Sequence, residues 1–128
     1  MKFTRKLLIG LGFIAGLALA GCGDSRRIDY SVPSLVKSLK DPDPNTRYYA
    51  VKSLGGFGAQ ASSAVPDLTE ALKDDEAMVR MGAAYALAEV GTEAGSARPA
   101  LEQSAKDPDA KVRAAAAYAL KRLQGQRR

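Results

Sequence analysis

Hydrophobic residues along most of this chain recur at steps of three and four, the spacing of a helix that buries one face. In residues 79–90 the residues on that face would be Val79, Ala83, Ala86, Leu87 and Val90. A shorter apolar pattern precedes them at Val65, Leu68 and Leu72, with Pro66 near its start, where a helix tolerates proline. The two patterns predict a short helix followed by a longer one.

The whole pattern repeats without gaps at a period of 33 residues. Seven of the 33 columns hold one residue type in all three copies: Pro33, Pro66 and Pro99; Leu35, Leu68 and Leu101; Lys40, Lys73 and Lys106; Asp41, Asp74 and Asp107; Arg47, Arg80 and Arg113; Ala50, Ala83 and Ala116; Leu54, Leu87 and Leu120. Ordinary residue usage would give about 0.2 such columns, so chance is a poor explanation. We expect three copies, at about 31–63, 64–96 and 97–128.

The turn between the two helices of each copy is acidic. In copy one it contains Asp41-Pro42-Asp43-Pro44, which predicts an N-cap and a negative charge at the start of the second helix. The recurrent Asp41, Asp74 and Asp107 are interpreted as caps and not as catalytic groups, because they follow the structural period. Gly91 predicts a left-handed stop after the second helix of copy two.

A single hairpin cannot bury its apolar stripe, whereas stacked hairpins form a continuous core. The predicted fold class is therefore all-α, a short α-solenoid of three helical hairpins.

Residues 107–120 resemble the second half of a HEAT repeat, of the short type also found in phycobilin lyases, and the resemblance covers all three copies. Tetratricopeptide and ankyrin units have similar periods, but their Trp/Gly/Tyr and Thr-Pro-Leu-His signatures are absent. The resemblance implies that Arg47, Arg80 and Arg113 pair with the turn aspartates of their own or the next copy, each exposed pair contributing under about 1 kcal/mol. An anion-binding row of these arginines is the less favoured alternative.

The first 21 residues have the order of an export signal, with Lys2, Arg5 and Lys6 ahead of an apolar run from Leu7 to Ala20. That run has 14 residues, fewer than the roughly 20 that span a bilayer, so a permanent transmembrane helix is the weaker interpretation. We expect residues 1–21 to be removed.

The residues Leu19-Ala20-Gly21-Cys22 resemble the bacterial lipobox, which implies that Cys22 is lipidated and becomes the new N-terminus. Two or three acyl chains make a stable membrane anchor, and residues 22–30 would then be the tether. The alternative is an ordinary secretory signal, in which Ala18-Leu19-Ala20 is a cleavage site that leaves Gly21 first. Gly23 stands where the inner-membrane retention pattern has Asp, which favours the outer membrane in a host that has one.

The charge distribution argues against nucleic acid. Residues 1–21 hold three of the 19 basic residues and none of the 14 acidic ones, and Ser31 to Leu120 contain ten basic and twelve acidic residues. The positive surplus therefore lies at the two ends and not across a folded face. With no His, one Cys and no nucleophile beside a base, we expect no metal site, no cofactor and no enzymatic activity.

Three rows of residues lie on the face of the second helices opposite the predicted core: Asn45, Tyr48, Lys52 and Gly56; Met78, Met81, Tyr85 and Glu89; Lys111, Ala114, Tyr118 and Arg122. HEAT-like solenoids place this face on their concave side, where Tyr85 and Tyr118 would stand about 10 Å apart on adjacent helices. Aromatic, Met and Arg residues are typical of protein interfaces. The candidate protein-binding residues are therefore Tyr48, Lys52, Met78, Met81, Tyr85, Lys111, Tyr118 and Arg122. The alternative is a scatter of ordinary surface residues.

These observations predict a membrane-anchored lipoprotein of the bacterial cell envelope that binds a protein partner as an adaptor. The phycobilin-lyase resemblance offers a second hypothesis, a lyase-like subunit that attaches or handles a linear tetrapyrrole. Export would separate such a subunit from the cytoplasmic pigment machinery, so this hypothesis is disfavoured.

Overall fold

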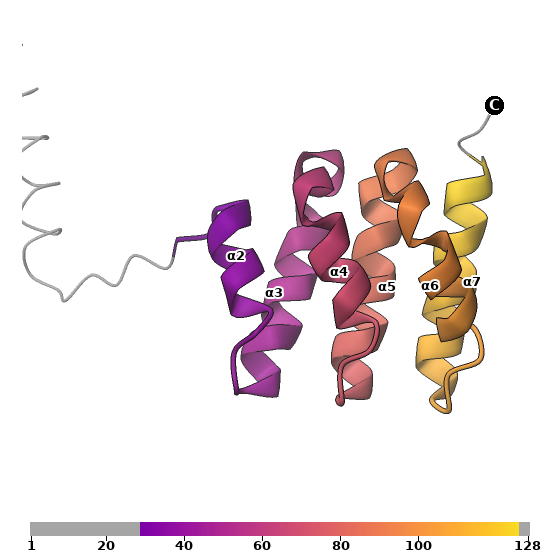
Figure 1. Cartoon of the computed structure of the whole chain (residues 1–128), viewed down its shortest axis with the longest axis horizontal. Helices are drawn as coiled ribbons and strands as arrows, with labels where there is room; N and C mark the ends of the chain where they lie inside the picture. Colours follow the sequence, from indigo (N-terminus) through magenta and orange to yellow (C-terminus); the bar gives the residue numbers. More distant parts are fainter. Residues whose placement is uncertain (1–28, 126–128) are drawn as a thin grey trace, which may run out of the picture.

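The computed structural model describes residues 29–125, and over this range its regular elements are all helices. Three hairpins stand side by side, each with a short first helix in front of a longer second helix (Figure 1). The first helices are α2 (Val32–Ser38), α4 (Val65–Ala71) and α6 (Arg98–Ser104), and the second helices are α3 (Pro44–Gly56), α5 (Ala77–Val90) and α7 (Ala110–Gly125). The predicted all-α solenoid is confirmed.

The export signal and the lipobox with Cys22 fall within residues 1–28, outside the described residues. Among the helices that the structure describes, none is long and apolar enough to cross a membrane.

Two 3₁₀ helices join the copies, η1 (Gly58–Ala64) and η2 (Gly91–Ala97), and the sequence pattern did not predict them. Each begins at a glycine with positive φ, +54° at Gly58 and +80° at Gly91, a conformation that favours glycine. Gly91 has ψ −139°, so the chain turns there with positive φ but not in the left-handed helical conformation that we predicted. Both connectors bury alanines at a spacing of three, which adds apolar surface to the core: Ala61, Ala64, Ala94 and Ala97.

The second helices of copies one and three are capped by aspartates. The carboxylate of Asp43 accepts the N–H of Asn45 at 3.1 Å, and Pro44 occupies the first helical position, where its missing N–H costs nothing. The carboxylate of Asp109 accepts the N–H groups of Lys111 and Val112 at 2.8 and 3.1 Å. In copy two the N-cap residue is Glu76, and its side chain makes no capping bond.

The recurrent aspartates are therefore not the helix caps that we expected. The carboxylates of Asp41, Asp74 and Asp107 instead accept the main-chain N–H two residues ahead, each at 2.9 Å. Such Asx turns hold the chain in the tight bend between the helices. In copies one and three the aspartate two positions later is the one that reaches the N–H groups of the second helix.

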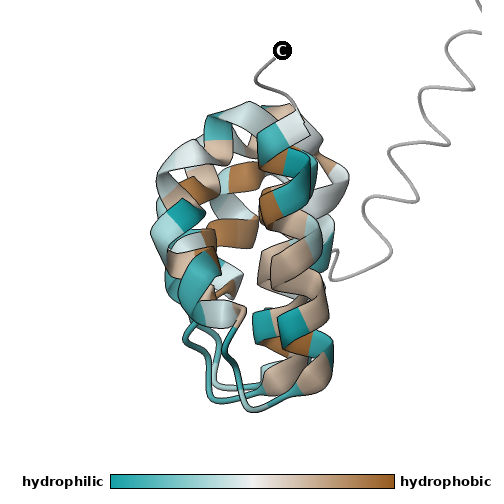
Figure 2. Ribbon diagram, turned by 90° about the vertical axis from the view of Figure 1, so that its right-hand side faces the viewer, coloured by the Kyte–Doolittle hydropathy of each residue, from teal (hydrophilic) through white to brown (hydrophobic). Residues whose placement is uncertain are grey.

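One hydrophobic core runs through all three copies. Its largest fully buried side chains are Leu54, Leu68, Leu87, Leu101, Val51, Val79 and Val112. A view along the array shows the first and second helices as two layers, with hydrophilic turns at one end (Figure 2). Because the core lies between layers and between copies, each copy depends on its neighbours.

The second helices of copies one and two approach closely because glycine is present on both. A Cβ added at Gly82 would lie 2.6 Å from a methyl carbon of Val51, and one at Gly55 would lie 3.2 Å from the Cα of Ala86. Between α5 and α7 the equivalent columns hold fully buried alanines: Ala84, Ala88, Ala115 and Ala119. Small residues therefore set the spacing of the second helices.

Arg47 joins copy one to copy two. Its Nε and Nη2 donate to the two carboxylate oxygens of Asp74, at 2.8 and 3.0 Å. Its Nη1 donates to the carbonyls of Asp41 and Pro42 in its own turn, at 2.8 and 3.1 Å. The guanidinium is thus held by carbonyls of its own copy and binds the carboxylate of the next copy through two parallel hydrogen bonds. This bidentate geometry is the strongest arrangement for a guanidinium and a carboxylate.

Arg80 repeats the arrangement with Asp107, at 2.9 and 3.1 Å. The side chains of Asp74 and Asp107 are 11% and 9% exposed. These pairs are therefore mostly buried, whereas the sequence suggested that they would be exposed. Arg113 donates to two carbonyls of its own turn at 2.7 and 2.9 Å, and no carboxylate within residues 29–125 pairs with it. Asp41 has no arginine partner in the same range, so the predicted ladder has two links there.

The ladder lowers the pKa of both linking carboxyl groups. The hydrogen bond from Arg80 is the main reason that the pKa of Asp107 falls, and it outweighs the opposing effect of burial. Burial works to raise the pKa of Asp74, but the hydrogen bonds from Arg47 and from the Glu76 N–H together bring it below its ordinary value. The folded protein therefore holds these protons less tightly than the unfolded chain.

We expect Leu87→Ala to lower the free energy of unfolding by about 2 to 5 kcal/mol, because the side chain is fully buried in the middle copy and its removal leaves a cavity. Denaturant unfolding followed by circular dichroism measures the change. Leu120→Ala is the matched control, since Leu120 occupies the same column but is only half-buried at the end of the array. Equal losses for the two variants would contradict a core centred on the middle copy.

We expect acid to remove the contribution of the ladder. With a folded pKa below the unfolded value of about 3.9, the stabilisation is complete above that value and is lost as pH falls through the folded pKa. Asp107→Asn should lower the free energy of unfolding at pH 7 by roughly 1 to 3 kcal/mol and make its decline between about pH 5 and 2 shallower. Urea unfolding at a series of pH values tests this. An unchanged decline in the variant would show that the pair does not carry the effect.

Candidate interaction surface

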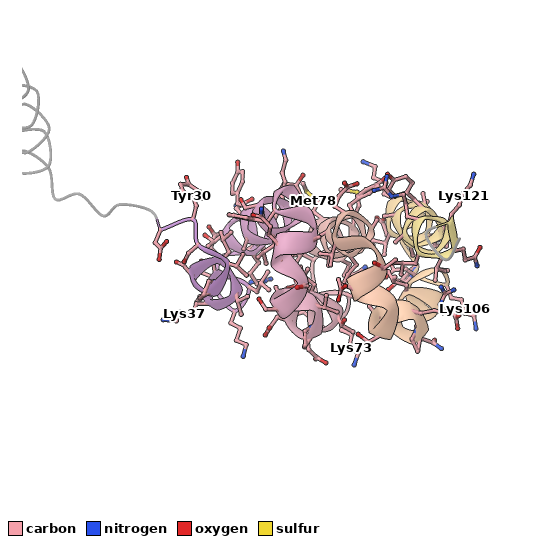
Figure 3. All side chains as sticks on the ribbon, turned by 90° about the horizontal axis from the view of Figure 1, so that it is seen from above. Tyr30, Lys37, Lys73, Met78, Lys106 and Lys121 are labelled. Carbon is pink, nitrogen blue, oxygen red and sulfur yellow. The ribbon has the colours of Figure 1, made fainter. Side chains whose placement is uncertain are left out.

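The second helices form one long side of the array, which we call the second-helix face. Met78 lies on this side, opposite Lys37, Lys73 and Lys106 (Figure 3). The exposed fractions are 56% for Met78, 42% for Tyr85 and 40% for Tyr118, whereas Tyr48 and Met81 are half-buried. The face thus presents aromatic and sulfur-containing side chains to solvent, as the sequence predicted.

The half of this face between α5 and α7 is closed. The ring centroids of Tyr85 and Tyr118 lie 5.6 Å apart with the planes tilted by 54°, closer than the helix spacing of about 10 Å because the side chains lean together. The guanidinium of Arg122 lies 5.9 Å from the centroid of the Tyr118 ring and 3.9 Å from the carboxylate of Glu89. These four side chains cover the gap between their two helices.

The half between α3 and α5 is open, with a hollow of about 490 Å³. On this side Lys52 takes the place that Tyr118 has in the closed half, and it stands opposite Tyr85. Gly56 likewise takes the place of Arg122 and stands opposite Glu89. Neither combination closes the gap. We call this the α3–α5 hollow.

The α3–α5 hollow has an apolar floor and aromatic walls. Its floor is made of small or short side chains: Val51, Gly55, Gly82 and Ala86. Tyr48, Met81 and Tyr85 form its walls, and Lys52, Gly56 and Glu89 complete its lining. A site of this size and composition suits an apolar group held by aromatic and methionine contacts.

The remaining candidates lie toward the turns. Met78, Met81 and Lys111 border a smaller hollow of about 180 Å³, together with Ala77 and Asp109. The structure therefore places the eight candidate residues around the α3–α5 hollow, in the tyrosine cluster and beside this smaller hollow, with Tyr85 and Met81 each shared between two of these places.

Sequence reasoning missed the glycines. Gly56 was placed on the second-helix face, but the consequence of its missing side chain depends on what the neighbouring helix has opposite it. Gly55 and Gly82 were not singled out, although the other copies have larger residues in these columns. The column of Gly55 has Ala88 and Lys121, and the column of Gly82 has Tyr49 and Ala115. Glycine in a helix interior is unfavourable and is a signal of close approach.

The polar chemistry of the described residues is simple. In residues 29–125 there is no group of three or more His, Cys, Asp or Glu side chains that could hold a metal ion. No buried side-chain nitrogen or oxygen in that range lacks a hydrogen-bond partner.

The family model for HEAT repeats matches residues 32–121. The crystal structure of an engineered protein is 25% identical to this chain, with a TM-score of 0.63, and the match covers 73% of this chain and 45% of that protein. This chain thus spans less than half the length of that protein. The comparison with curated proteins gives no match. Because the HEAT-repeat model accounts for well over half of the sequence, in the same range as the three hairpins, the chain belongs to the HEAT-repeat family.

Proposed function

We propose that this protein is a membrane-anchored lipoprotein of the bacterial cell envelope that binds a protein partner through its second-helix face. HEAT repeats generally mediate protein–protein interaction. The observation that carries the proposal is the concentration of aromatic and methionine side chains on one side of the array. Met78, Tyr85 and Tyr118 are exposed there, and the half-buried Tyr48 and Met81 line an open hollow together with Tyr85. Such residues are enriched in interfaces because they contribute large contact areas at low entropic cost.

The membrane anchor rests on the lipobox and on Cys22. An array of three hairpins offers a small docking surface, so its intrinsic affinity would be modest. Anchoring in the same membrane as the partner raises the effective concentration and compensates for this. In a host with two membranes, Gly23 favours the outer one, with the array facing the periplasm.

We expect Cys22→Ala to release the protein from the membrane fraction, because the variant lacks the thiol that would carry the lipid. Fractionation of cells and the mass of the mature N-terminus measure the change. Wild-type protein found in the soluble fraction, with Gly21 as its first residue, would show that the segment is an ordinary secretory signal.

We expect the double substitution Tyr85→Ala with Tyr118→Ala to weaken capture of the partner in cells, measured by crosslinking and recovery of the membrane fraction. The two rings contact each other at the surface, a contact that contributes about 0.5 to 1.5 kcal/mol beyond the area it buries, so the free energy of unfolding should fall by less than in the fully buried Leu87→Ala. Tyr30→Ala is the matched control, because Tyr30 is 59% exposed and precedes the first helix α2, outside the second helices. A double variant that folds and captures the partner as well as wild type would exclude this face.

A further inference from the structure

We propose that the α3–α5 hollow binds one aromatic side chain of a partner peptide whose neighbouring residues are acidic. This inference rests on the proposed function and specifies the chemistry of the partner. It starts from the difference between the two halves of the second-helix face, one closed by its own side chains and the other open.

The closed half shows what fills such a gap. Between α5 and α7 the Tyr118 ring lies against Tyr85, and the Glu89–Arg122 pair covers the position next to it. Between α3 and α5 the chain has Lys52 in the column of Tyr118 and Gly56 in the column of Arg122. An aromatic ring supplied by another molecule would make contacts with Tyr85 like those that Tyr118 makes on the other side.

The lining of the hollow favours an aromatic ring over a polar group. Val51 and Ala86 form an apolar floor, Met81 can contact a ring edge with its sulfur, and Tyr48 provides a second aromatic wall. Within the described residues no buried side-chain polar atom is left without a partner, so no group in the hollow requires a hydrogen bond from the ligand. The volume of about 490 Å³ is sufficient for a large side chain and the adjoining backbone.

The charges around the hollow favour acidic flanking residues. No carboxylate of residues 29–125 lies within ion-pair distance of Lys52. Glu89, the acidic residue of the three rows on this face, is already close to Arg122. The other charged members of these rows are Lys111 and Arg122, so the three rows together hold three basic residues and one acidic residue. Acidic residues beside the aromatic anchor would be attracted to it and basic ones repelled.

The test uses short synthetic peptides with a single Trp flanked on both sides by Asp. The full-length protein, purified in detergent micelles, contains no Trp, so selectively excited indole fluorescence comes from the peptide alone. Empty micelles measure any binding to detergent. Two comparison peptides are used. The first has Ala in place of Trp, and its binding is followed through an attached fluorescent label. The second keeps Trp and has Lys in place of Asp.

We expect a blue shift of the peptide emission on binding to the wild-type protein. The affinity should be at least about tenfold weaker for Gly56→Leu, because the leucine side chain fills the hollow from the rim. A Cβ at Gly56 meets nothing within 4 Å, so the variant should fold with unchanged helical content. Gly95→Leu is the matched control, since Gly95 also has open space around its Cα but lies in η2, away from the hollow. It should bind like wild type.

The acidic preference has its own comparison. The Lys-flanked peptide should bind at least about threefold more weakly than the Asp-flanked one, and Lys52→Gln together with added salt should reduce that difference. Equal binding of the Trp and Ala peptides, equal binding to wild type and Gly56→Leu, or equal affinity for the two flanking charges would each overturn the inference. If Gly56→Leu leaves crosslinking to the cellular partner intact while the tyrosine double variant abolishes it, the proposed function stands and the chemistry assigned to the hollow is wrong.

Discussion

The close approach of neighbouring second helices is the constraint on which the other features of this array depend. Glycine at position 82 allows α5 to lie directly against Val51, with no room for a single added carbon. At this separation the guanidinium of Arg47 reaches the turn of the next copy, and the core leucines of adjacent hairpins belong to one hydrophobic cluster. A larger residue at position 82 would therefore disturb both the core and the ladder.

The same spacing decides what the surface can do. Side chains in one column of adjacent second helices come within contact distance, as Tyr85 and Tyr118 do. Whether a gap is filled or left open then depends on a few residues: Lys52 and Gly56 stand in the open half in the columns that hold Tyr118 and Arg122 in the closed half. A repeated scaffold can in this way contain a site in one interface and none in the next, with little change in the core.

The helices and their number were predictable because the apolar columns repeat with a fixed period, and burial of a periodic stripe leaves few alternatives. Details that depend on two partners at once were not. Asp74 was interpreted as a cap, since its sequence position suits one, but its carboxylate accepts from Arg47 of the preceding copy and from the N–H of Glu76, which precedes the following helix. The α3–α5 hollow exists partly because Gly55, Gly56 and Gly82 have no side chains to fill it. A search of the sequence for aromatic, methionine and charged residues does not reveal such a site. The role of Cys22 remains a prediction, because it lies outside the described residues.

Each arginine link joins residues that are 27 positions apart, and both links have the same bond pattern. The link is made between two adjacent copies alone, so it contains no information about how many copies a chain should have. A chain in which residues 64–96 were duplicated would place Arg80 against another Asp74, and Ala84 against another Gly82, although Glu89 would then stand beside another Glu89. The length of the second-helix face is thus a quantity that gene duplication can change one unit at a time, while the two ends of the array stay as they are.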